Sequence, residues 1–76
     1  MVYLSLIREY DDKNVCIYED RVIFGSKSKA EDYQKQDLLD RIQSEDTSWS
    51  AEEPNLVKYP QGYYVRYDLE EHDIKM

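Results

Sequence analysis

Hydrophobic and polar residues alternate most clearly near the C-terminus, between residues 62 and 71. The aromatic and aliphatic set is Tyr63, Val65, Tyr67 and Leu69, and the mostly charged set between them is Tyr64, Arg66, Asp68 and Glu70. Because successive side chains of a strand point to opposite faces, this period of two predicts a strand. We expect its apolar face to lie on a core and its charged face to lie in water.

Two segments near the N-terminus predict an antiparallel hairpin. Residues 2–10 and 15–24 are both rich in aliphatic, β-branched and aromatic side chains, which are favoured in strands. Between them, residues 11–14 read Asp-Asp-Lys-Asn, a composition that favours a turn.

Residues 27–43 predict a helix, because they are rich in helix formers and contain neither glycine nor proline. The apolar side chains that gather on one side of this helix are Ala30, Tyr33, Leu38 and Ile42, with Leu39 at the margin. Ion pairs along such a helix contribute only a few tenths of a kcal/mol each, so packing against a sheet must hold it in place.

Residues 44–61 show no regular pattern, and we expect a long connection there. Ser50 can begin a single helical turn, and Leu56–Val57 can add a short extended piece. Tyr59-Pro60-Gln61-Gly62 predicts a type I turn before the final strand. The order β-β-α-loop-β predicts one α+β domain over residues 1–76, with a small antiparallel sheet and one helix packed on a face.

The small size of the chain favours self-association. A domain of 76 residues buries a thin core, and a single cysteine offers no internal disulfide. We therefore expect a homodimer. We expect Cys16 to be a small buried hydrophobe in a reducing compartment. No apolar run is long enough to span a membrane and no signal peptide is visible, so we expect a cytoplasmic protein.

The charge is strongly acidic and unevenly distributed. The chain has a formal net charge of −7, which disfavours direct binding to nucleic acid or to anionic membranes. Residues 27–43 hold four acidic and four basic residues, whereas residues 44–76 hold eight acidic and only three basic residues. The excess negative charge therefore lies after the predicted helix.

We expect these carboxylates to form one negative face that binds a partner. Carboxylates on a strand face or a helix turn lie about 6–7 Å apart, close to the spacing of phosphates along a DNA strand. The candidate contacts are Glu45, Asp46, Glu52, Glu53, Asp68, Glu70, Glu71 and Asp73, supplemented by Tyr64 and Trp49. In its polar segment, Trp49 is either a lid over the core or an exposed anchor, and we favour the lid.

In size, acidity and scattered tyrosines, the chain resembles small phage-encoded inhibitors that mimic DNA. The acidic segments that carry this resemblance are Glu45-Asp46, Glu52-Glu53 and Asp68 to Asp73. The resemblance implies a non-enzymatic inhibitor of a basic host DNA-binding protein, such as a nucleoid protein, a nuclease or a defence effector. It implies no role for any individual residue, because these inhibitors share no common motif.

No pattern of residues indicates catalysis, a metal or a cofactor. His72 is a lone histidine without a second histidine or cysteine cluster, so we expect no metal site. Cys16 and His72 lack the signature of a nucleophile and its base, and neither glycine opens a phosphate loop. The alternative function is an interaction or assembly module that pairs through an exposed strand edge, with its acidity serving solubility.

Overall fold

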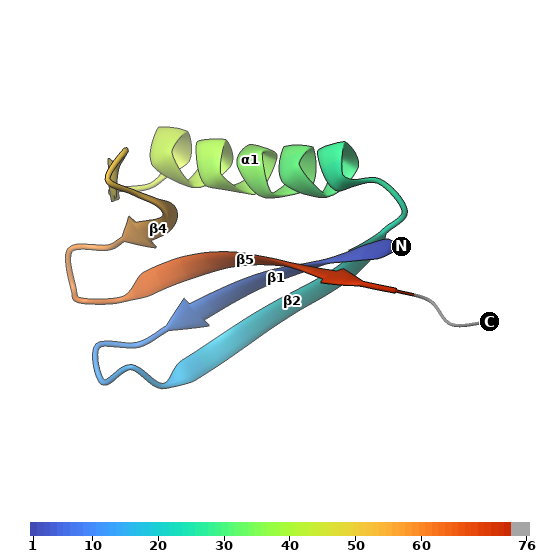
Figure 1. The fold of residues 1–76 in the computed structure, drawn as a ribbon. Helices are drawn as coiled ribbons and strands as arrows, with labels where there is room; N and C mark the ends of the chain where they lie inside the picture. The colour runs from blue at the N-terminus through green and yellow to red at the C-terminus, as the bar shows by residue number, and fades with distance from the viewer. Residues whose placement is uncertain (74–76) are drawn as a thin grey trace.

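The computed structural model describes residues 1–73 and shows five strands and one helix (Figure 1). The elements are β1 (Val2–Tyr10), β2 (Cys16–Phe24), α1 (Lys27–Ser44), β3 (Ser48–Ser50), β4 (Glu53–Lys58) and β5 (Tyr64–His72). All paired strands are antiparallel, in the order β2-β1-β5-β4-β3. The predicted α+β class is confirmed, because α1 packs on one face of the sheet against β1, β2 and β5.

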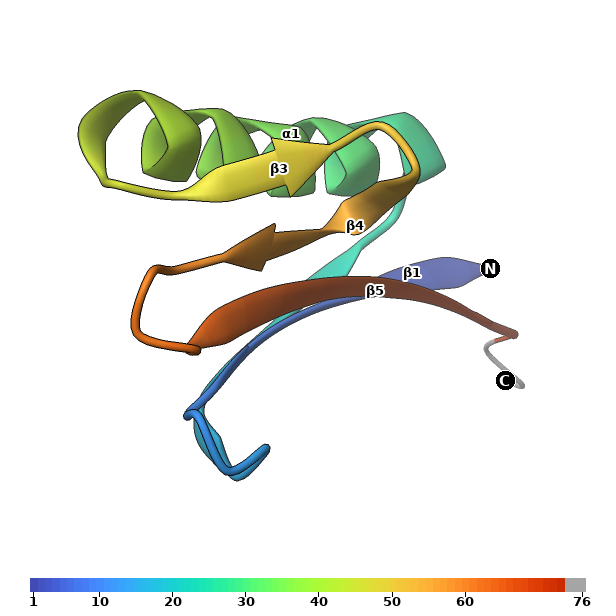
Figure 2. The ribbon, with the colours of Figure 1, turned by 90° about the vertical axis from the view of Figure 1, so that its left-hand side faces the viewer.

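The expectation of a long irregular connection after the helix is wrong, since it contains β3 and β4, whereas the short extended piece expected at Leu56–Val57 is confirmed within β4. Trp49 lies opposite Val57 in the β3–β4 pair, and a bulge follows Trp49. Ser50 ends β3 instead of opening a helical turn. Figure 2 shows the sheet curling so that β3 lies at the height of α1. Strand pairing satisfied the backbone of this polar segment, although its sequence carries little hydrophobic alternation.

The core lies between α1 and the central strands. Ile7, Val57, Val65 and Tyr67 are buried, and Ile7 faces Tyr67 across β1 and β5 as Val57 faces Val65 across β4 and β5. Leu38 and Ile42 of α1 and Tyr59 pack against this cluster. The apolar faces predicted for the helix and for the last strand therefore meet. Tyr33 and Tyr63 are the exceptions, because both are exposed, and Tyr63 lies in the turn before β5.

Within residues 1–73, no helix covers the opposite face of the sheet. Leu6 lies on this face, between Arg21 of β2 and Asp68 of β5, and is nevertheless buried. α1, the helix of the described chain, is too polar to cross a membrane.

Gly62 allows two turns to approach each other at one end of the sheet. Its N–H donates to the Tyr59 carbonyl oxygen at 3.1 Å, which confirms the predicted turn. Gly62 has φ +92°, and a Cβ at this position would lie 3.2 Å from the Cβ of Asp12 in the β1–β2 turn. A side chain would therefore be strained in its backbone and crowded by its neighbour.

We expect Gly62→Ala to lower the free energy of unfolding by about 1–2 kcal/mol, because alanine disfavours positive φ. Chemical denaturation with a circular dichroism readout measures this change. Gly25→Ala is the matched control, since nothing lies within 4 Å of its Cβ position and its φ is outside the left-handed region. Equal losses in the two variants would contradict this explanation.

Candidate functional site

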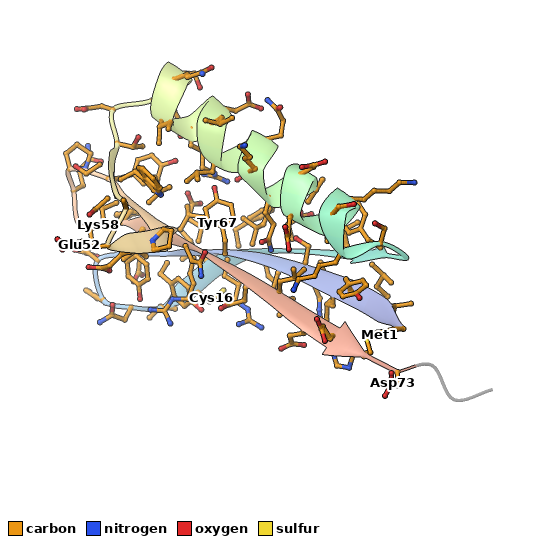
Figure 3. All side chains as sticks on the ribbon, turned by 45° about the horizontal axis from the view of Figure 1, so that its top comes forward. Met1, Cys16, Glu52, Lys58, Tyr67 and Asp73 are labelled. Atoms are coloured by element: carbon orange, nitrogen blue, oxygen red, sulfur yellow. The ribbon has the colours of Figure 1, made fainter. Side chains whose placement is uncertain are left out.

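The eight candidate carboxylates are spread over the C-terminal end of α1, the β3–β4 turn and β5 with the residue after it, and of these groups only Glu53 and Asp68 line a common pocket in the described chain. Glu45 and Asp46 follow the C-terminal end of α1, whereas Glu71 lies 3.9 Å from Lys27 at the start of the same helix. The 18 residues of α1 separate these two places by roughly 27 Å. Glu52 and Glu53 lie at the turn between β3 and β4, and Figure 3 shows Glu52 well apart from Asp73. The expected single negative face is therefore not formed.

Several of these carboxylates have a basic partner nearby. Asp68 lies 3.8 Å from Arg8, and Glu53 lies 3.9 Å from Lys58. Glu70 Oε1 accepts a hydrogen bond from His72 Nε2 at 3.1 Å. Exposed pairs of this kind contribute little to stability, but they reduce the negative field that a partner would meet. A role for these residues in binding a partner stays a prediction.

The two aromatic candidates differ in how firmly the fold holds them. The Tyr64 ring stacks on Tyr10 at a centroid distance of 4.8 Å, and its hydroxyl donates to Asn14 Oδ1 at 2.9 Å. Trp49 is 43% exposed and donates from Nε1 to the Pro54 carbonyl oxygen at 3.1 Å. The preference for Trp49 as a lid is wrong, because β3 is the outermost strand on its side and leaves the indole at the surface. The contacts of Tyr64 mainly stabilise the β1–β2 turn against β5.

The surface that sequence reasoning missed is the outer edge of β2. This strand is nine residues long and is the last in the sheet, so its outer backbone groups face no other strand of residues 1–73. Its sequence predicts a strand but carries no signal for its place at the edge. The large apolar side chains that are half or more exposed in and beside it are Val15, Ile17, Tyr18 and Ile23. We define these four residues, together with the outer backbone of β2, as the β2 edge.

Charged residues occupy the centre of β2. Glu19 lies 3.3 Å from Arg8 and 3.7 Å from Arg21 on the open face of the sheet. Asp20 points to the helix side, where it accepts a hydrogen bond of 2.5 Å from the Tyr33 hydroxyl. This hydrogen bond, with partial burial, raises the pKa of Tyr33 to about 12. Charges at the centre of an edge strand discourage unspecific pairing, so any partner of β2 must match them.

A polar cluster beneath the C-terminal half of α1 ties the helix to the sheet. Arg41 Nε lies 2.8 Å from Asp37 Oδ2, and its NH1 donates to the Tyr59 hydroxyl at 2.9 Å. The Tyr67 hydroxyl donates to Asp37 at 2.6 Å, and burial raises the pKa of Tyr67. Tyr59 donates in turn to Glu45. No buried side-chain nitrogen or oxygen of the described chain lacks a hydrogen-bond partner, which is the pattern of a structural cluster.

Cys16 lies exposed at the start of β2, so the expectation of a buried cysteine is wrong. Cys16 lies opposite Tyr10 at the end of the outermost strand, where no further strand of residues 1–73 covers it. Within residues 1–73, no three His, Cys, Asp or Glu side chains lie close enough together to hold a metal.

Comparison with protein-family models, curated proteins and solved structures finds no significant match for this chain. The resemblance to phage inhibitors therefore stays a prediction. The β2 edge is the most distinctive feature of the surface of this chain.

Proposed function

We propose that this chain is a non-enzymatic protein-interaction module that binds its partner through the β2 edge. The observation that carries this proposal is a nine-residue outermost strand with four large apolar side chains half or more exposed in and beside it. In small proteins, large exposed apolar side chains beside unpaired backbone groups usually mark a site of interaction with another chain. The exposed thiol of Cys16 fits a reducing compartment, and we place the protein in the cytoplasm.

The chemistry of this surface suits the addition of a partner strand. A strand laid beside β2 satisfies its outward N–H and C=O groups, and its alternate side chains meet those of β2. Each large aliphatic side chain that becomes buried contributes about 1.5–3 kcal/mol. The partner must also offer opposite charges to Glu19 and Arg21, which gives the contact its specificity.

A second candidate function is inhibition of a basic host DNA-binding protein by an acidic surface. The net charge of −7 favours it, as does the placement of Asp68 and Glu70 two residues apart on one face of β5. Such neighbours lie about 6–7 Å apart, near the phosphate spacing of a DNA strand. The acidic surface available for this function is smaller than the sequence suggested, because Glu45, Asp46 and Glu71 lie near the ends of α1.

Capture of partners from a bacterial lysate separates the two functions when two variants of equal charge change are compared. Ile17→Lys/Ile23→Lys adds two positive charges on the β2 edge, and Asp68→Asn/Glu70→Gln removes two negative charges from the open face of β5. Edge binding predicts that only the first variant loses its partner and that affinity changes little with salt. An acidic mimic predicts loss with the second variant and an affinity that falls steeply with salt. Capture of the same protein in equal amounts by the wild type and the lysine variant would contradict the proposed function.

A further inference from the structure

We propose that the β2 edge binds a second copy of this chain, with two β2 strands antiparallel about a two-fold axis at Asp20. This inference rests on the proposed function and names its partner. Antiparallel pairing about an axis perpendicular to the sheet joins two five-stranded sheets into one of ten strands, with both helices on the same face. The interface is then self-complementary, as two-fold symmetry requires.

The sequence of β2 matches itself in this register. Glu19 of each copy lies opposite Arg21 of the other, which forms two pairs of unlike charge on the open face. Ile17 lies opposite Ile23 and Tyr18 opposite Val22, so apolar residues meet apolar residues on both sides of the centre. The Arg21 side chain can turn toward the second copy, because it is 62% exposed. Its contact with Glu19 of its own chain, at 3.7 Å, is a weak surface ion pair that does not hold it in place.

Neighbouring registers are less favourable. Side chains that lie opposite each other must be on the same face of the sheet. The neighbouring registers that meet this condition place the two-fold axis at Glu19 or at Arg21. An axis at Glu19 places the two Glu19 carboxylates together and sets Ile17 against Arg21. An axis at Arg21 places two guanidinium groups together and sets Glu19 against Ile23. The charge pattern therefore selects the axis at Asp20.

The axis itself carries one unfavourable pair, since Asp20 of one copy lies opposite Asp20 of the other. Each carboxylate already accepts the Tyr33 hydroxyl, which draws it toward its own helix. The remaining repulsion weakens the dimer and keeps it reversible. Asp20→Asn removes the repulsion while retaining an oxygen that accepts from Tyr33, so this variant is expected to dimerise about threefold more tightly or better.

Charge reversal tests the register directly. Glu19→Arg and Arg21→Glu each place like charges at both symmetric pairs, and each is expected to weaken dimerisation by about tenfold or more. An equimolar mixture of the two variants restores unlike charges at both pairs and is expected to form the mixed dimer. The double variant Glu19→Arg/Arg21→Glu is expected to dimerise like the wild type. Sedimentation equilibrium measures all four, with circular dichroism confirming that each variant folds.

The possible failures are distinguishable. A wild-type chain that stays monomeric at every concentration overturns the second-copy proposal, while loss of the captured partner in Ile17→Lys/Ile23→Lys would leave the edge function standing. A wild-type dimer whose mixed charge variants stay monomeric overturns the register at Asp20. A wild-type dimer that is unaffected by Ile17→Lys/Ile23→Lys overturns both the second-copy proposal and the β2 edge as its surface.

Discussion

Replacing Ile7 by alanine is expected to lower the free energy of unfolding by about 2–5 kcal/mol. Ile7 is 2% exposed and lies in the centre of the core cluster, opposite Tyr67 of β5. Alanine leaves a cavity that the two packed layers cannot fill, since α1 is fixed by its polar cluster. Small domains have limited stability, so a loss of this size populates the unfolded chain at physiological temperature. Urea denaturation monitored by circular dichroism measures the change.

Ile23→Ala is the matched control for this substitution. The same atoms are removed from a side chain on β2 that is 68% exposed. At a protein concentration where the chain is monomeric, we expect the loss to stay below about 0.5 kcal/mol. Comparable losses from the two substitutions would mean that the core does not lie between α1 and the sheet.

Replacing Arg41 by methionine is expected to cost about 2 kcal/mol. Methionine keeps the aliphatic stem but removes the cation that contacts Asp37, the Tyr59 hydroxyl and, at 3.8 Å, Glu9. Breaking a fully buried ion pair costs about 3–5 kcal/mol, and the smaller figure applies here because the Arg41 side chain is 20% exposed. The two carboxylates then repel each other without a cation between them.

Arg66→Met provides the comparison, since Arg66 is exposed and forms no ion pair with any residue from 1 to 73. It also lies directly across from Arg8 on the neighbouring strand. Its removal is expected to leave stability unchanged or slightly raised, because a like-charge pair is relieved. Thermal and urea unfolding of both variants measure the difference. If Arg66→Met is the more damaging substitution, the Arg41 cluster does not hold the helix.

Much of the fold could be predicted from local periodicity. The final strand buries Val65 and Tyr67 as its alternation indicates, and the helix buries Ala30 and directs Leu38 and Ile42 to the core. In these elements the pattern of apolar residues and the tertiary contacts agree. The β3–β4 hairpin could not be predicted in the same way, because its stability comes from pairing with β5 and from Val57, its one buried residue.

The candidate site was harder to predict, because a surface depends on the order of strands in space. Glu45 and Glu71 both belong to the acidic part of the sequence after the helix, yet they lie near opposite ends of α1. Conversely, Ile17 and Ile23 look like core residues of an ordinary strand, and only the sheet order shows that β2 is at an edge. Charge counts along the chain do not contain this information.

The position of β5 has a consequence for how the chain matures during synthesis. β5 is last along the chain but lies between β1 and β4, so it joins the two hairpins into one sheet. Until residues 64–72 have left the ribosome, β1 and β4 each keep an unpaired side, and Ile7 and Val57 lack Tyr67 and Val65, their neighbours in the core. The sheet therefore cannot close before β5 has been synthesised, and a nascent chain halted before β5 exposes two unjoined hairpins to chaperones and proteases.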